Sequence, residues 1–177
     1  MTEHFKFLQS HPPRCLDGYT AIPYDGKGIE IDGHGAEYNT FYQLQCQCGG
    51  KTHSVLGYYW EEPESSSVCF IGPIATKCTT CEVVNELFDI KIHGYDSELG
   101  YGCFNERGKG AKSRFESSEF TATSFELIAR FEYMSGIYDD DFTEAKGQEK
   151  ELFTWFSLHG ESHVSGEYHE ICSYECA

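Results

Sequence analysis

Two closely spaced pairs of cysteines are the residues of this chain best suited to chemistry. The first pair is Cys46 and Cys48, which two glycines follow, and the second pair is Cys78 and Cys81. Four thiolates from two such pairs can occupy the corners of a tetrahedral zinc ion. The glycines after the first pair provide the backbone freedom for a tight turn around the ion. The sequence therefore predicts a closed, structural zinc site at these four cysteines.

Two alternatives to a zinc site remain open for the same residues. Cys78 and Cys81 have the Cys-x-x-Cys spacing of a redox pair. Redox pairs usually lie at the start of a helix, where the helix dipole lowers the thiol pKa, whereas the residues after Cys81 alternate as in a strand. The thiols could also be unrelated core residues, because free cysteine is commonly buried.

The cysteine spacing resembles that of known zinc-binding β proteins. In the zinc-ribbon group, two turns at the ends of hairpins share one zinc ion, and Mss4-like zinc-knuckle β proteins hold a structural zinc in a similar way. Among the latter, glutathione-dependent formaldehyde-activating proteins also have a Cys-x-Cys pair and a later Cys-x-x-Cys pair. They carry an additional cysteine cluster for chemistry, whereas only Cys69 lies between the two pairs here. The resemblance covers residues 41–92 and implies a structural zinc.

A second group of metal-ligating residue types lies late in the sequence. Its members are His159, His163, Cys172 and Cys176. On one extended strand the two cysteines would lie ~13 Å apart, at about 3.3 Å per residue, so they could share an ion only if the chain bends between them. The two histidines could converge across the turn at Gly160. A second metal site at these four residues therefore remains an alternative.

The elements that position these residues are expected to be β-strands. From residue 38 onward, short runs of alternating apolar and polar side chains are separated by turn-forming residues, which is typical of strands. The runs that we expect to be strands are residues 42–46, 56–60, 68–71, 87–92, 125–133, 152–159 and 167–176. Residues 1–37 are rich in proline and glycine and are expected to be irregular. Residues 143–151 could form a short helix.

These patterns predict a mainly β fold, or a β-rich α+β fold, with zinc-knuckle hairpins and an antiparallel sheet. We expect a single domain over residues 1–177, which could be subdivided into a zinc-knuckle sheet at 38–104 and an antiparallel sheet at 119–177. A mobile loop at 105–118 would join the two parts. This polar loop is either a solvated connection or a segment that contacts an anion, because it holds four of the 13 basic residues, Arg107, Lys109, Lys112 and Arg114.

The composition of the chain is strongly acidic. Its 13 basic and 29 acidic residues give a formal net charge of −16 with neutral histidines. Such a charge repels phosphate backbones and anionic membrane surfaces, so it argues against binding to nucleic acid or membranes. The same field attracts a basic protein partner. Nine cysteines without a visible export signal or membrane helix favour thiols in a reducing compartment, so we expect a cytoplasmic protein.

Common catalytic motifs are absent from the sequence. The His-x-Glu of zinc deaminases occurs only at residues 159–161, after the Cys-x-x-Cys pair that it should precede. Metalloprotease, nucleophile-elbow and P-loop motifs are missing as well. We therefore expect a non-enzymatic, zinc-stabilised acidic protein that binds a basic protein partner, as immunity or inhibitor proteins do. A metal- or thiol-dependent enzyme and a metal sensor or carrier are the alternatives. No motif identifies the partner or the oligomeric state.

Overall fold

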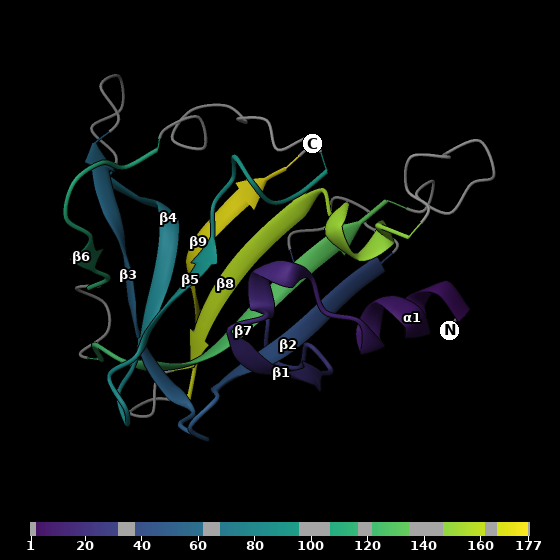
Figure 1. Ribbon diagram of the computed structural model, residues 1–177, viewed down its shortest axis with the longest axis horizontal. Helices are drawn as coiled ribbons and strands as arrows, with labels where there is room; N and C mark the ends of the chain where they lie inside the picture. The colour runs from purple at the N-terminus through teal and green to yellow at the C-terminus, as the bar shows by residue number, and fades with distance from the viewer. Residues whose placement is uncertain are drawn as a thin grey trace.

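A curled antiparallel sheet makes up most of the molecule, which confirms the prediction of a mainly β fold (Figure 1). The computed structural model describes residues 3–31, 38–61, 68–95, 107–116, 122–134, 147–161 and 166–176. Within these segments the sheet has nine strands: β1 (Tyr19–Tyr24), β2 (Tyr38–Cys46), β3 (Thr52–Glu61), β4 (Val68–Cys78), β5 (Val84–Phe88), β6 (Ser113–Arg114), β7 (Phe125–Tyr133), β8 (Trp155–Glu161) and β9 (Tyr168–Glu175).

The strand β7 is the branch point of the sheet. The main path runs β1-β2-β7-β3-β4-β5, and β8 pairs with β7 and carries β9 on its other edge. Most of β7 pairs with β2, while its first two residues pair with Thr52 and His53 of β3. Strands from residues 38–104 and from residues 119–177 therefore belong to one continuous sheet.

Residues 3–31 are more regular than the composition of residues 1–37 predicts. Residues Glu3–Ser10 form the helix α1, Arg14–Leu16 form a 3₁₀ turn, and β1 pairs with β2 along its full length. Pro23 is tolerated because β1 lies at the edge of the sheet, where a missing N–H breaks no ladder. The buried side chain of Leu8 and a hydrogen bond from Tyr42 Oη to its carbonyl fasten α1 to β2.

Six of the seven expected strands are present, although their ends differ by several residues. The expected strand at 87–92 is wrong beyond Phe88, where β5 ends. The Asp89 carboxylate accepts the N–H of Lys91, and the Asp89 carbonyl accepts the N–H groups of Ile92 and His93. These bonds close a turn, which apolar alternation alone does not reveal. Of the expected helix at 143–151, the described part contains only a 3₁₀ turn at Glu149–Glu151.

The core is built largely from aromatic rings on one face of the sheet. Phe88 stacks on Phe156 with ring centroids 4.1 Å apart, and Phe131 packs edge-on against Phe153 at 4.8 Å. All four rings are at most 2% exposed. Burying a side chain of this size contributes about 1.5–3 kcal/mol, so these contacts hold β5, β7 and β8 together.

The basic stretch at 107–116 is attached to the sheet. β6 within it pairs with Leu56 and Gly57 of β3. The N–H of Phe115 donates to Val55 O at 2.8 Å, and the N–H of Gly108 donates to Gly72 O at 2.9 Å. The backbone of this stretch therefore has fixed partners on β3 and β4.

Candidate metal centre

The four cysteines of the two pairs lie together beyond the ends of β2 and β4. Their sulfur atoms are all within 4.8 Å of one another. The Sγ atoms of Cys46 and Cys81 are 3.5 Å apart, and those of Cys48 and Cys78 are 3.7 Å apart. A tetrahedron with Zn–S bonds of ~2.3 Å has S–S edges of ~3.8 Å, so the spacing suits a tetrahedral thiolate centre.

The first cysteine turn links β2 to β3 and depends on its two glycines. The N–H of Gly49 donates to Cys46 O, and the N–H of Cys46 donates to Gly50 O, both at 2.8 Å. Gly49 has a φ of +87°, which favours glycine. A Cβ atom on Gly50 would lie only 2.7 Å from Cys78 Sγ, so the second glycine lets the two turns approach each other.

The second cysteine turn links β4 to β5. The N–H of Cys78 donates to Val83 O and the N–H of Glu82 donates to Cys78 O, both at 3.0 Å. The N–H of Thr79 donates to Thr52 O at 3.0 Å, which ties this turn to the start of β3. Both turns are therefore positioned by backbone bonds that do not involve the sulfur atoms.

Backbone N–H groups also point at two of the sulfurs. The N–H of Gly50 lies 3.4 Å from Cys48 Sγ, and the N–H of Thr80 lies 3.4 Å from Cys78 Sγ. Each donor comes two residues after its cysteine, so the two turns repeat one local arrangement. Such donors stabilise the negatively charged thiolate that a metal requires.

The surroundings separate the pKa values of the clustered thiols. Burial alone would raise the pKa of Cys78, but hydrogen bonds from the backbone N–H groups of Cys81 and Thr80 and from neighbouring thiols lower it to about 6. The backbone N–H of Cys48 lowers the pKa of Cys46, whereas burial and the other thiols together raise it to about 12. Four thiols packed this closely do not all lose their protons without a cation, because the negative charges would repel one another. A bound cation offsets that repulsion.

The geometry does not match a thioredoxin-like redox pair. Cys78 is the last residue of β4, and Cys81 lies in the turn that leads into β5 rather than into a helix. Cys78 and Cys81 are both free cysteines, and Cys81 Sγ lies 3.5 Å from Cys46 Sγ, well beyond a disulfide bond length of about 2.05 Å. The pairs thus contact each other across the two turns.

The C-terminal group of histidines and cysteines does not form a second metal cluster among the described residues, where the four-cysteine group alone has suitable spacing. In the β8–β9 register, Cys172 lies opposite Leu158, while His159 lies opposite Glu170. Cys172 and Cys176 are both buried on the extended chain of β9 and its end. His163 lies outside the described residues.

A buried histidine near the cysteine pairs was not predicted from the sequence. His53 lies directly opposite Cys78 in the β3–β4 register and is 0% exposed. Its ring packs edge-on against Tyr19, and neither ring nitrogen has a hydrogen-bond partner within the described segments. Burial lowers the pKa of His53, so the ring is neutral near pH 7. The only sequence signal was its position five residues after Cys48.

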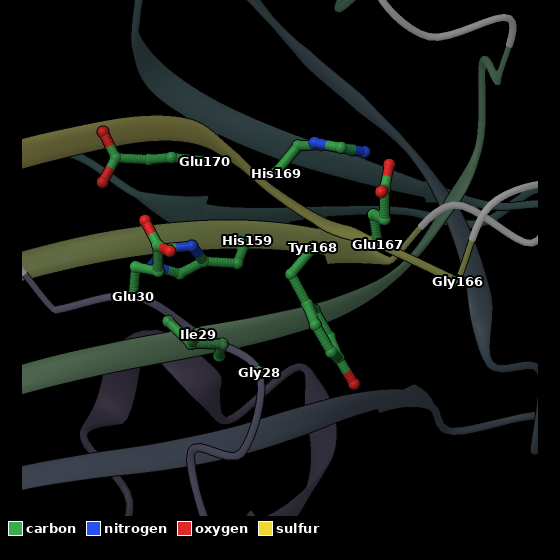
Figure 2. A pocket seen from close by; sticks show the side chains of 9 residues that line it. All are labelled: Gly28, Ile29, Glu30, His159, Gly166, Glu167, Tyr168, His169 and Glu170. Carbon is green, nitrogen blue, oxygen red and sulfur yellow. The ribbon is translucent and has the colours of Figure 1, made fainter.

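His159 belongs to a surface pocket instead of a metal centre. The pocket has a volume of about 710 Å³ and lies between residues 28–30 and the start of β9, with side chains from both segments flanking His159 (Figure 2). The Ser157 hydroxyl lies 2.9 Å from His159 Nε2. Burial and, to a lesser degree, the nearby Arg130 lower the pKa of His159 to about 4. The imidazole is therefore neutral at pH 7.

Comparison of the chain with protein-family models, with curated proteins and with solved structures finds no match. The resemblance to zinc-knuckle proteins thus stays a prediction from cysteine spacing. Within the described segments, no helix has the length and apolar character needed to cross a membrane. The function is therefore inferred from the site itself.

Proposed function

We propose that this chain binds one zinc ion through Cys46, Cys48, Cys78 and Cys81, and that the ion is structural. The observation that carries the proposal is the set of four sulfurs within 4.8 Å of one another. Four protein thiolates fill a tetrahedral coordination sphere and leave no position for a substrate. Soft thiolate ligands in this geometry favour zinc over the hard cations magnesium and calcium.

The proposed ion would join parts of the sheet that share no backbone ladder. Cys46 ends β2, while Cys78 ends β4, and β7 and β3 lie between these strands in the sheet. A zinc ion would close the curled sheet at this end. Because metal binding requires the folded arrangement, its free energy would add to the stability of the fold.

Elemental analysis of the purified protein tests this proposal. We expect one zinc per chain in the wild type and a loss of most of it in Cys46→Ser and in Cys81→Ser. Cys69→Ser is the matched control, because Cys69 lies in β4 outside the cluster and should leave the zinc content unchanged. Full zinc content in both cluster variants would contradict a four-thiolate site.

We further propose that the protein acts without catalysis, by binding a basic protein partner through its acidic surface. The net charge of −16 supports this proposal, because it speeds association with cations and repels anionic partners. Titration with candidate basic proteins over a salt series should yield complexes that weaken steeply as ionic strength rises. A salt-insensitive affinity would count against this mode of binding.

Two measurements separate this proposal from its alternatives. A zinc ion with fewer than four protein ligands and a bound water would favour a metal-dependent enzyme. A metal carrier would release its ion to a chelator and remain folded, whereas a structural centre loses stability with its ion. X-ray absorption spectroscopy at the zinc edge and unfolding with chelator provide these two measurements.

A further inference from the structure

A second pocket, distinct from the metal centre, gathers basic residues in an otherwise acidic protein. It has a volume of about 560 Å³ and lies between the middle of β4, the end of β5 with the turn that follows it, and the stretch 107–112. Its charged lining has three cations against two carboxylates, a net charge of +1, while the chain as a whole carries −16. The charged residues are Arg107, Lys109, Lys112, Glu86 and Asp89.

A nearly buried carboxylate orients the arginine of this pocket. Arg107 Nε lies 3.2 Å from both carboxylate oxygens of Asp89, and Arg107 Nη2 lies 2.5 Å from Asp89 Oδ2. The Asp89 side chain is 10% exposed and that of Arg107 is 43% exposed. Within the described segments, Nη1 of Arg107 has no partner. One edge of the guanidinium is thus held by the protein, and the rest is available to an anion.

The backbone of Asp89 also determines which ring nitrogen of His93 carries the proton. The backbone N–H of Asp89 donates to His93 Nδ1 at 3.0 Å, so Nδ1 is an acceptor. Burial lowers the pKa of His93, which keeps the ring neutral, and a neutral ring with an accepting Nδ1 carries its proton on Nε2. His93 lines the pocket, so its one ring N–H, on Nε2, is the donor that it would offer to a ligand there.

The basic stretch is held in place before any ligand binds. The Tyr58 hydroxyl donates to Gly110 O at 3.2 Å, and a Cβ on Gly108 would lie 2.0 Å from the ring of Tyr58. Lys112 is fixed by Glu86, with Nζ 2.8 Å from its nearer oxygen. Lys109 is exposed and forms no ion pair with another described residue. The pocket thus combines oriented donors with one unpaired cation.

We propose that this pocket binds a small molecule that carries a phosphate or carboxylate group, with Arg107, His93 and Lys109 as the anion donors. Pro73, Phe88 and Ile92 also line the pocket, so the ligand should have an apolar part beside its anionic group. The size suits a small molecule, since such sites enclose about 300–1,000 Å³. A polyanion such as nucleic acid is disfavoured by the overall acidic field. The proposal is independent of the metal centre.

Nuclear magnetic resonance titration of the full chain tests this assignment. Inorganic phosphate and acetate are the probes, and the Arg107 Nε–H and Gly108 N–H signals are the readout. We expect saturable shifts at these groups and an affinity about tenfold lower or more in Arg107→Gln, because a charged hydrogen bond contributes about 1.5–3 kcal/mol. Lys109→Gln should weaken binding about two- to fivefold by removing one solvent-screened charge. Lys6→Gln, an equal charge change in α1 outside the pocket, should bind as the wild type does.

The two probes also distinguish the chemistry of the ligand. Tighter binding of phosphate identifies a phosphate site, and tighter binding of acetate identifies a carboxylate site; either result supports the pocket. Shifts that grow linearly without saturation, or equal affinities in Lys109→Gln and Lys6→Gln, would overturn the proposal. Arg107→Gln could fail to fold because Asp89 loses its partner. In that case the affinity of Lys109→Gln for the probe anion is the deciding measurement, since the exposed Lys109 side chain has no partner among the described residues.

Discussion

Single residues decide whether the two cysteine turns can meet. Gly50 is the clearest case, because its missing side chain leaves room for Cys78 Sγ and for Thr80 Oγ1, which would lie 2.7 Å and 2.8 Å from a Cβ atom. The requirement is one of space, whereas Gly49 is required for its positive φ. The two neighbouring glycines therefore serve the metal centre for different physical reasons.

We predict that Gly50→Ala weakens zinc binding about fivefold or more. The added methyl group would push the two turns apart, and overpacking of this kind costs about 1–3 kcal/mol. A competition titration with a coloured zinc chelator measures the effect. Gly147→Ala is the control, because nothing lies within 4 Å of the Cβ position of Gly147, although its positive φ adds a backbone strain that Gly50 lacks. Equal zinc affinities in the two variants would show that the contact with Cys78 does not matter.

A single residue, His159, also makes the free energy of unfolding depend on pH. Its pKa is about 4 in the folded protein against a usual value of 6.5, so the unfolded chain binds more protons between these values. Stability is thus fully present above about pH 6.5 and is lost as the pH falls towards 4. We expect His159 to account for a loss of about 2 kcal/mol between pH 7 and pH 5, at about 1.36 kcal/mol per pKa unit.

Denaturant unfolding at pH 7 and pH 5 measures this loss. His159→Gln removes the titrating ring but can still hydrogen-bond to Ser157, whose hydroxyl lies 2.9 Å from His159 Nε2. The variant should lose about 2 kcal/mol less than the wild type over this interval. The prediction fails if both proteins lose the same free energy, since other groups would then cause the pH dependence.

Among the elements, the stretch 107–116 depends on β3 for its position. Its Gly108 lies against the ring of Tyr58, and its Phe115 donates an N–H to Val55 O at 2.8 Å. The ring of Phe115 also packs on Phe70, with centroids 5.1 Å apart, and Arg107 and Lys112 form ion pairs with Asp89 and Glu86. Backbone bonds, side-chain contacts and the close approach at Gly108 therefore hold the stretch together. The anion pocket proposed above exists only while this attachment persists.

We predict that Gly108→Ala detaches this stretch without unfolding the sheet. A Cβ atom would lie 2.0 Å from Tyr58 Cγ, which no rearrangement of the ring alone relieves cheaply. Amide hydrogen exchange at Phe115 should become at least tenfold faster, while exchange in β7 and β8 stays unchanged. Gly110→Ala is the comparison, because it has a positive φ but open space around it. Unchanged exchange at Phe115 would contradict the role of the Gly108 contact.

For the molecule as a whole, the proposed zinc connects the turn between β2 and β3 with the turn between β4 and β5. The aromatic core holds β5, β7 and β8 through contacts such as Phe88 with Phe156, but the cysteine turns lie beyond the ends of β2 and β4. Local bonds shape each turn, and the centre joins them. Removal of the ion should therefore affect the stability of the entire fold.

We predict that a strong chelator lowers the midpoint of thermal unfolding by about 10 °C or more. A ligand at 1,000 times its Kd stabilises by about 4 kcal/mol, and a chain of this size gains about 2–4 °C per kcal/mol. Scanning calorimetry with and without chelator measures the shift. Cys46→Ser, already lacking a ligand, should melt at the same temperature in both conditions. A wild-type midpoint that chelator leaves unchanged would argue against a structural metal.

The sequence alone determined the features that depend on neighbours along the chain. The cysteine turns were predictable because spacing and glycines shape them locally, and most strands were predictable because alternation reflects the two faces of a sheet. The strand β1 was missed because it contains Pro23, which an edge strand tolerates although a central strand does not. The end of β5 was also missed, because the side chain and carbonyl of Asp89 close that turn.

Only the tertiary structure brought together groups that are distant in sequence. His53 lies opposite Cys78 because β3 pairs with β4, and Arg107 meets Asp89 because a later stretch returns to the end of β5. No local pattern specifies such pairings, since burial and strand register select them over the whole chain. The sequence identified the four cysteines, whereas the curled sheet decided their arrangement and formed the pocket proposed to bind an anion.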